Sequence, residues 1–319
     1  VEGSIPLTRS NKRVFMKKSN IITKFFQKFV KHRDIRKFKK NYFYYILFRL
    51  SRKFLNNYIE VKIYNFKILA SNKKNKTSHA ILKKCNFDDQ HELKTIKKFS
   101  DKKKLFFLDC GCNYGFYSFY TASLSKNNFV ISFEASLKTI SDFDKNLQLN
   151  NFQNIILKNL AISGIDNDKV LLNESLNDWE SSLTHNNFEK KKSTTVNTTT
   201  IDSALKEYTI NNQFLFIKLD IEGHELQAIK GGENTIRKYK PIIIIELSKY
   251  IFENNEDSFF FLETFLLNFD YSIYGTNNKL ITIEEIKYFL KNLNSDHKTI
   301  GNYYLIKNDK SLIDIFLNE

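Results

Sequence analysis

The sequence predicts an α/β protein built on a doubly wound, mostly parallel sheet. Short, wholly apolar runs recur along the chain, segments with helical spacing separate them, and the clearest of these units carries a glycine turn. With 319 residues, 42% of them hydrophobic, the chain is long enough to bury a large core. Alternating strands and helices of this kind are typical of a sheet with helices on both faces.

The segment from Leu105 to Glu134 is the clearest of these units. It opens with four apolar residues, Leu105–Leu108, which indicate a strand buried on both faces. Aromatic and small residues then follow at helical spacing through 116–124, and a second apolar run, Phe129–Phe133, ends at an acid. This order of strand, turn, helix, strand and carboxylate predicts one half of a mononucleotide-binding fold.

The turn between the first strand and the helix has the pattern D-x-G-x-N-x-G, and it supplies four predicted cofactor-binding residues: Asp109, Gly111, Asn113 and Gly115. The two glycines allow a tight turn and a close approach of the backbone to a ligand. Glu134 is the fifth, because a carboxylate that ends the next strand can accept hydrogen bonds from both ribose hydroxyls. A plain structural glycine turn is the alternative.

The turn also limits the kind of nucleotide. It lacks the third glycine of the dinucleotide fingerprint, and the chain has no G-x-x-x-x-G-K-[ST] motif, which disfavours a nucleoside triphosphatase. Asp109 stands ahead of the first glycine, where an acid suits a cation better than a pyrophosphate. The amino group of S-adenosylmethionine is such a cation.

Three phrases resemble the FkbM-type family of class I S-adenosylmethionine-dependent methyltransferases. They are FLDCGCNYGFYS, IKLDIEGHELQAIKGGENTI and KPIIIIE, and they occur in the family's order. The resemblance implies a seven-stranded Rossmann-like methyltransferase sheet, with an antiparallel strand at 303–306. It also implies S-adenosyl-L-methionine as the cofactor. In this superfamily the adenine lies near the end of the third strand, here Ile155–Leu160, so the resemblance adds Ala161 to the cofactor-binding residues.

The second group of predicted site residues follows the fourth apolar strand, Phe214–Leu219. Asp220, Glu222 and His224 stand there, at the edge of the sheet where ligands bind in open α/β folds. We expect His224 to act as a general base, because histidine titrates near neutral pH, and the two acids to orient it or the acceptor. Helix capping by the acids and a solvent-facing histidine are the alternatives. A divalent ion held with Glu246 is another, and we assign no metal.

Charge divides the chain into two predicted parts. Residues 1–104 contain 29 lysines and arginines against 7 acids, whereas 105–319 contain 21 against 28. We predict a basic, aromatic-rich helical extension over 1–57 and a methyltransferase domain over 58–319, with a nucleotide-binding core at about 105–247. The extension is expected to cap the domain, with docking on an anionic membrane surface as an alternative and nucleic acid as a less favoured one.

The resemblance implies methyl transfer to a hydroxyl of a saccharide, glycan or related small molecule. No Asn-Pro-Pro-type phrase and no cysteine stand near residue 220, which disfavours amino-adenine and 5-methylcytosine chemistry. An RNA-directed methyltransferase and a non-catalytic membrane-surface scaffold remain alternatives. Three cysteines form no disulfide framework, and no apolar run reaches the length of a membrane span, so we expect a cytoplasmic enzyme. Peripheral contact with the inner membrane face is an alternative.

Overall fold

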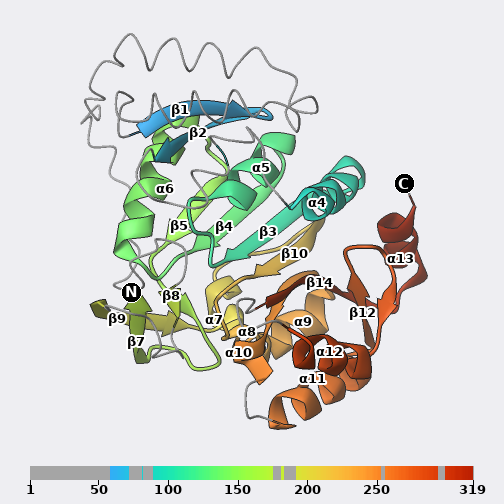
Figure 1. The fold of residues 1–319 in the computed structure, drawn as a ribbon. Helices are drawn as coiled ribbons and strands as arrows, with labels where there is room; N and C mark the ends of the chain where they lie inside the picture. Colours follow the sequence, from blue (N-terminus) through green and yellow to red (C-terminus); the bar gives the residue numbers. More distant parts are fainter. Residues whose placement is uncertain are drawn as a thin grey trace, which may run out of the picture.

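The structure is a computed structural model, and it describes residues 58–71, 81, 89–174, 181–182, 192–252, 256–293 and 299–318 (Figure 1). The predicted helical extension at 1–57 lies outside the described residues. Most of the predicted domain from residue 58 onward is described, including both groups of predicted site residues.

A central eight-stranded sheet organises the fold, in the order β13-β12-β14-β11-β10-β3-β4-β5. Its strands are β3 (Lys104–Cys110), β4 (Phe129–Phe133), β5 (Ile155–Lys158), β10 (Gln213–Leu219), β11 (Ile242–Ser248), β12 (Tyr271–Gly275), β13 (Leu280–Ile281) and β14 (Thr299–Lys307). The five strands β5, β4, β3, β10 and β11 run parallel, and β14 is antiparallel to both of its neighbours. The predicted doubly wound, mostly parallel sheet is therefore confirmed, with the two-residue β13 added at one edge as an eighth strand.

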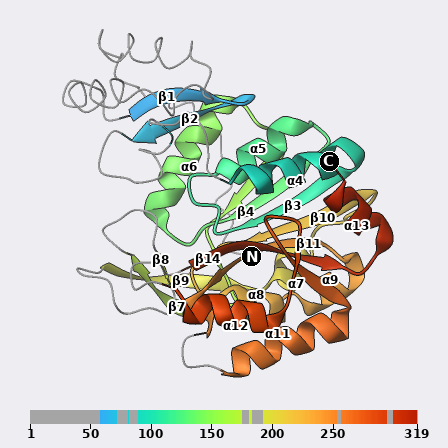
Figure 2. The same cartoon turned by 45° about the vertical axis from the view of Figure 1, so that its right-hand side comes forward.

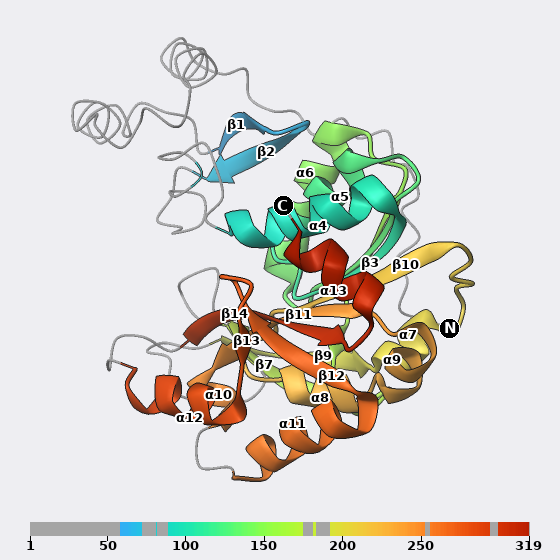
Figure 3. The same cartoon turned by 90° about the vertical axis from the view of Figure 1, so that its right-hand side faces the viewer.

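Helices cover both faces of this sheet, as Figure 2 and Figure 3 show. They are α4 (Gln90–Lys102), α5 (Phe116–Leu124), α6 (Leu137–Asn150), α7 (Ile201–Leu205), α8 (Glu225–Lys230), α9 (Glu233–Tyr239), α10 (Lys249–Phe252), α11 (Glu256–Phe269), α12 (Ile283–Lys291) and α13 (Lys310–Leu317). Alternate residues of the strands feed two separate cores: Phe107 and Ile244 pack with α4, α5, α6 and α13, whereas Leu108 and Ile245 pack with α7, α8, α9, α11 and α12. Burial on both faces explains why β3 and β11 are apolar throughout.

A hairpin, β1 (Tyr58–Ile63) and β2 (Phe66–Ser71), covers α5 and α6 on the outer side (Figure 1). The two strands pair antiparallel, with Ile63 opposite Phe66 across the turn. Asn146 of α6 holds it in place: its buried side chain accepts from the β2 backbone N–H of Leu69 at 2.7 Å and donates to the carbonyl of Tyr114 at 3.2 Å. One buried amide thus ties the hairpin to the glycine turn.

A smaller four-stranded sheet lies beside the main one, in the order β6-β9-β7-β8. Its strands are β6 (Ala161–Ile162), β7 (Lys169–Glu174), β8 (Ser181–Ser182) and β9 (Lys192–Thr199). Thr200 caps α7, and its hydroxyl accepts from the Ser203 N–H. Asp202 accepts from the Asn234 and Thr235 N–H groups and so caps α9. Tertiary packing brings the start of α9 within reach of this carboxylate.

Candidate active site

A cavity of about 250 Å³ opens at the carboxyl ends of β3, β4, β10 and β11. Most of the predicted site residues line it, namely Gly111, Asn113, Glu134, Ala161, Asp220 and Glu222. Asp109, Gly115 and His224 do not belong to its lining. The sheet therefore brings the two groups of predicted residues, which are about 100 positions apart in the sequence, to one site.

The glycine turn forms the floor of the cavity. Gly111 has φ +79°, and a Cβ there would lie only 1.9 Å from the carbonyl oxygen of Asp220. The Gly111 and Cys112 N–H groups both donate to the Phe133 carbonyl at 3.0 Å, so the turn joins the ends of β4 and β10. Gly115 serves packing: its φ is +85°, and a Cβ would lie 2.5 to 2.7 Å from the rings of Phe143 and Phe119. Only glycine suits either position.

Glu134 is held firmly at the end of β4. Its Oε2 accepts from the Asn113 N–H at 3.0 Å and its Oε1 from the Ser136 N–H at 2.8 Å. Burial raises the pKa of this carboxyl to about 7, and these backbone hydrogen bonds only partly oppose the effect. The side-chain oxygen of Asn113 is also buried and has no hydrogen-bond partner in the described part of the chain. A pair of ribose hydroxyls supplies donors for these oxygens, so the site fits a nucleoside.

The far end of the cavity, beyond Glu134, is apolar. Leu160, Ala161 and Ile162 line it, and Ala161 is only 6% exposed. Asn159 fixes this segment to the end of β4 by donating to the carbonyls of Glu134 and Ala135. An apolar slot beside the carboxylate of Glu134 suits a flat adenine ring.

Asp109 lies beneath the turn, away from the cavity. It is 1% exposed, and its Oδ2 accepts from the Ser118 hydroxyl at 2.5 Å. Burial raises its pKa to about 6, an effect that Lys218 partly offsets. In this geometry Asp109 ties α5 to β3, and its Oδ1 is buried with no hydrogen-bond partner among the described residues. A contact of this carboxylate with the cofactor stays a prediction.

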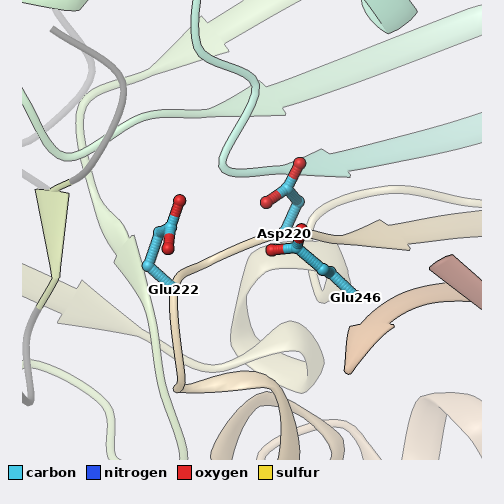
Figure 4. A group of neighbouring side chains, drawn as sticks. All are labelled: Asp220, Glu222 and Glu246. Carbon is cyan, nitrogen blue, oxygen red and sulfur yellow. The ribbon is translucent and has the colours of Figure 1, made fainter. Parts of the chain in front are cut away.

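Three carboxylates converge at the ends of β10 and β11 (Figure 4). Oxygens of Asp220, Glu222 and Glu246 all lie within 4.8 Å of one another. Burial raises the pKa of Glu246 well above its ordinary value, and the charges of Asp220 and Glu222 raise it further. Such a group could hold a divalent cation or the hydroxyls of an acceptor. Clusters of carboxylates are common in proteins that bind no metal there, and we assign no metal ion to this one.

His224 begins the helix that follows these acids, as the N-cap residue of α8. Burial lowers the pKa of its imidazole, and its Nδ1 is buried with no hydrogen-bond partner among the described residues. Its neighbour Glu225 shapes the loop, accepting from the N–H groups of Ile221 and Gly223. The role of His224 as a base stays a prediction, and the acids lie nearer the cavity than the ring does.

Lys218 is a further charged residue of the same cavity, and it is not among the residues that the sequence patterns indicated. Lys218 is 2% exposed, its Nζ lies 2.6 Å from the Oδ2 of Asp220, and it sits 4.6 Å from the ring centroid of Tyr117. The Tyr117 hydroxyl donates to the Oδ2 of Asp89 at 2.6 Å. A lysine inside the apolar run FLFIKL was the available signal, because buried lysines need a partner. No comparable signal marked Asp89.

The strand order, the glycine turn, the carboxylate that ends β4 and the acids after β10 together define a Rossmann-like, S-adenosylmethionine-dependent methyltransferase. The model of the methyltransferase FkbM domain matches residues 109–273, more than half of the chain. The chain therefore belongs to the FkbM methyltransferase family, as its three phrases predicted. S-adenosylmethionine is its cofactor and supplies an electrophilic methyl group.

Solved structures with a similar fold are methyltransferases of several kinds. An FkbM methyltransferase from Methylobacillus flagellatus is 18% identical with a TM-score of 0.38, over 72% of this chain and 53% of that one. A putative O-methyltransferase from Klebsiella pneumoniae is 13% identical, with a TM-score of 0.40 over 70% and 82% of the two chains. A putative methyltransferase from Streptococcus mutans, in complex with SAH, is 10% identical, with a TM-score of 0.39; the match covers 70% of this chain and 99% of that one.

The match to the Methylobacillus protein spans about half of that protein's length, 53%. No curated protein matches the sequence significantly.

Proposed function

We propose that the enzyme transfers a methyl group to a hydroxyl of a saccharide, glycan or related small molecule. The observation that carries the proposal is the convergence of Asp220, Glu222 and Glu246 at the end of the cavity opposite the apolar slot. Carboxylates accept hydrogen bonds from neighbouring hydroxyls of a polyol, whereas they repel a phosphodiester backbone. The cavity therefore favours a polyhydroxyl acceptor over RNA, in spite of the basic sequence at 1–57.

In this proposal Asp220 and Glu222 hold the acceptor in line with the methyl group. Orientation of this kind can remove roughly 7–11 kcal/mol from a barrier. Glu246 takes the hydroxyl proton, because its raised pKa makes it a better base than an ordinary carboxylate. A general base contributes about 10²–10⁴-fold. His224 is the alternative base, although its ring does not line the cavity.

The test is transfer of labelled methyl from S-adenosylmethionine to two acceptor panels, one of neutral mono- and oligosaccharides and one of structured RNAs. We expect label in a saccharide, lost in Glu246→Gln while the affinity for S-adenosylhomocysteine stays within about threefold. His224→Ala, assayed in parallel, separates the two candidate bases. Label in RNA alone would refute the acceptor class.

We also propose that the enzyme works in the cytoplasm, where thiols stay reduced. Cys110 and Cys112 are free and buried. No helix in the described part of the chain combines the length and apolarity that a membrane crossing requires. Peripheral contact through residues 1–57 remains a proposal based on their charge, and flotation with anionic vesicles, with and without those residues, tests it.

A further inference from the structure

A second hollow lies at the opposite edge of the main sheet, where the parallel strands begin. It is a groove of about 380 Å³ at the amino ends of β10, β3, β4 and β5. β3 is seven residues long, and a strand rises about 3.3 Å per residue, so roughly 20 Å separates this groove from the glycine turn. We call it the amide groove, because half of its lining consists of side-chain amides, those of Asn127, Asn128, Gln153, Asn154 and Gln213.

Two of these amides are fixed by backbone carbonyls and keep an oxygen for a ligand. The Asn154 Nδ2 donates to the Asn128 carbonyl at 2.8 Å, with two more carbonyls at 3.3 and 3.4 Å. The Gln213 Nε2 donates to two carbonyls at 3.4 and 3.5 Å. Neither the Asn154 Oδ1 nor the Gln213 Oε1 accepts a hydrogen bond from another described residue. The groove therefore offers two acceptors whose positions are set before a ligand arrives.

Three aromatic rings form the apolar part of the groove. The ring centroids of Phe106, Phe129 and Tyr208 lie 5.3 to 6.0 Å apart, and the rings are inclined to one another by 46° to 69°. Phe106 is 2% exposed and supports the other two rings, which are half-buried and present part of their apolar surface. Rings inclined in this way make a curved apolar surface rather than the parallel-walled slot that suits a flat heterocycle.

The lining also limits the charge of a ligand. Lys126 is the single charged residue among the described residues of the groove, and it is exposed. One exposed ammonium beside two amide oxygens is a weak site for an anion, and without a carboxylate the groove has no counter-charge for a cation. An uncharged ligand with several hydroxyl donors and an apolar face fits best. A pyranose has both, because its hydroxyls lie around the rim and its C–H groups form a face.

We propose that the amide groove is a saccharide-binding site, separate from the cavity at the carboxyl ends of the strands. A sugar ring packs its C–H face on Phe129 and Tyr208 and donates hydroxyl hydrogens to the Asn154 Oδ1 and the Gln213 Oε1. A sugar bound there is too far from the cavity to receive the methyl group, so the site serves binding alone. The inference goes beyond the proposed function and does not depend on which acceptor is methylated.

The test is saturation-transfer difference NMR on the full chain, with methyl α-glucoside, methyl β-galactoside and N-acetylglucosamine as separate probes. We expect at least one of them to bind with a dissociation constant on the order of 1 mM. Gln213→Met removes the amide oxygen at nearly constant size and should weaken that sugar about fivefold, the loss of one hydrogen bond. Tyr208→Leu should weaken it about 3- to 10-fold, through loss of the aromatic face.

Gln148→Met and Tyr288→Leu are the matched controls, because both residues are exposed and lie outside the groove. They should leave the affinity unchanged, and so should Glu246→Gln, which alters only the cavity. Binding that is lost in Glu246→Gln but kept in Gln213→Met and Tyr208→Leu belongs to the cavity and overturns the groove site.

The wild-type protein decides if neither groove variant folds. Saturation transfer to none of the three sugars in a folded sample overturns the proposal. Uracil is the probe for a flat heterocycle, and saturation transfer to uracil but to no sugar overturns the ligand class.

Discussion

Replacing Glu134 with glutamine should stabilise the protein at high pH while weakening its cofactor site. The carboxyl of Glu134 has its pKa raised from 4.5 to about 7, first by burial. The folded state therefore holds the proton more tightly than the unfolded chain does. The stability that this group contributes is complete below about pH 4.5 and is lost as the pH rises to about 7.

The size of the effect follows from linkage. Ionisation of Glu134 lowers the free energy of unfolding by about 3 kcal/mol at pH 8, where the carboxylate is ionised in both the folded and the unfolded state. At pH 5 it lowers the free energy of unfolding by about 1 kcal/mol. Glutamine does not ionise, so the variant keeps the stability that wild type loses on ionisation. Its side chain has only one oxygen, however, so it can accept from only one of the Asn113 and Ser136 N–H groups. Giving up one hydrogen bond costs about 1 kcal/mol at either pH. The difference in unfolding free energy, variant minus wild type, should therefore rise by about 2 kcal/mol between pH 5 and pH 8.

Urea denaturation of both proteins at the two pH values measures this change without any ligand. Other buried carboxyls titrate in both proteins and cancel in the difference. Glu284→Gln, at a side chain that is 80% exposed, is the control and should show no such rise. A variant whose stability relative to wild type is the same at both pH values would refute the reasoning that burial strains this carboxylate.

Three further substitutions test other parts of the site. Gly111→Ala should cost at least about 2 kcal/mol and abolish S-adenosylhomocysteine binding, because its Cβ would lie 1.9 Å from the Asp220 carbonyl; thermal melting and calorimetry measure both effects. Asn146→Ala should cost about 2–4 kcal/mol in urea, since it removes the acceptor of a β2 N–H and a donor to the Tyr114 carbonyl; a loss below about 0.5 kcal/mol would contradict the anchoring role. His224→Ala should leave S-adenosylhomocysteine affinity within about twofold, because the ring lies outside the cavity lining; a large loss would place it in the cofactor site.

The sequence determined the sheet and its binding edge because these depend on local patterns. Apolar runs such as Leu105–Leu108 indicate strands buried on both faces, and the glycine turn marks where the first of them ends. A carboxylate that ends the following strand, Glu134, is then placed beside the turn by the parallel pairing of β3 and β4. Fold class and family therefore followed from the chain alone, and so did the position of Glu134 in the lining of the cavity.

Tertiary structure decided which charged side chains share the cavity. Asp89 and Lys218 are far apart in the sequence and lie on different elements, and only packing of α4 and α5 on the sheet brings both to Tyr117. The same packing buries Asp109 under α5, because a side chain near the end of a central strand faces the helix that covers it. Side-chain direction at the end of a strand depends on the layers above and below it, and that information is absent from the spacing of residues along the chain.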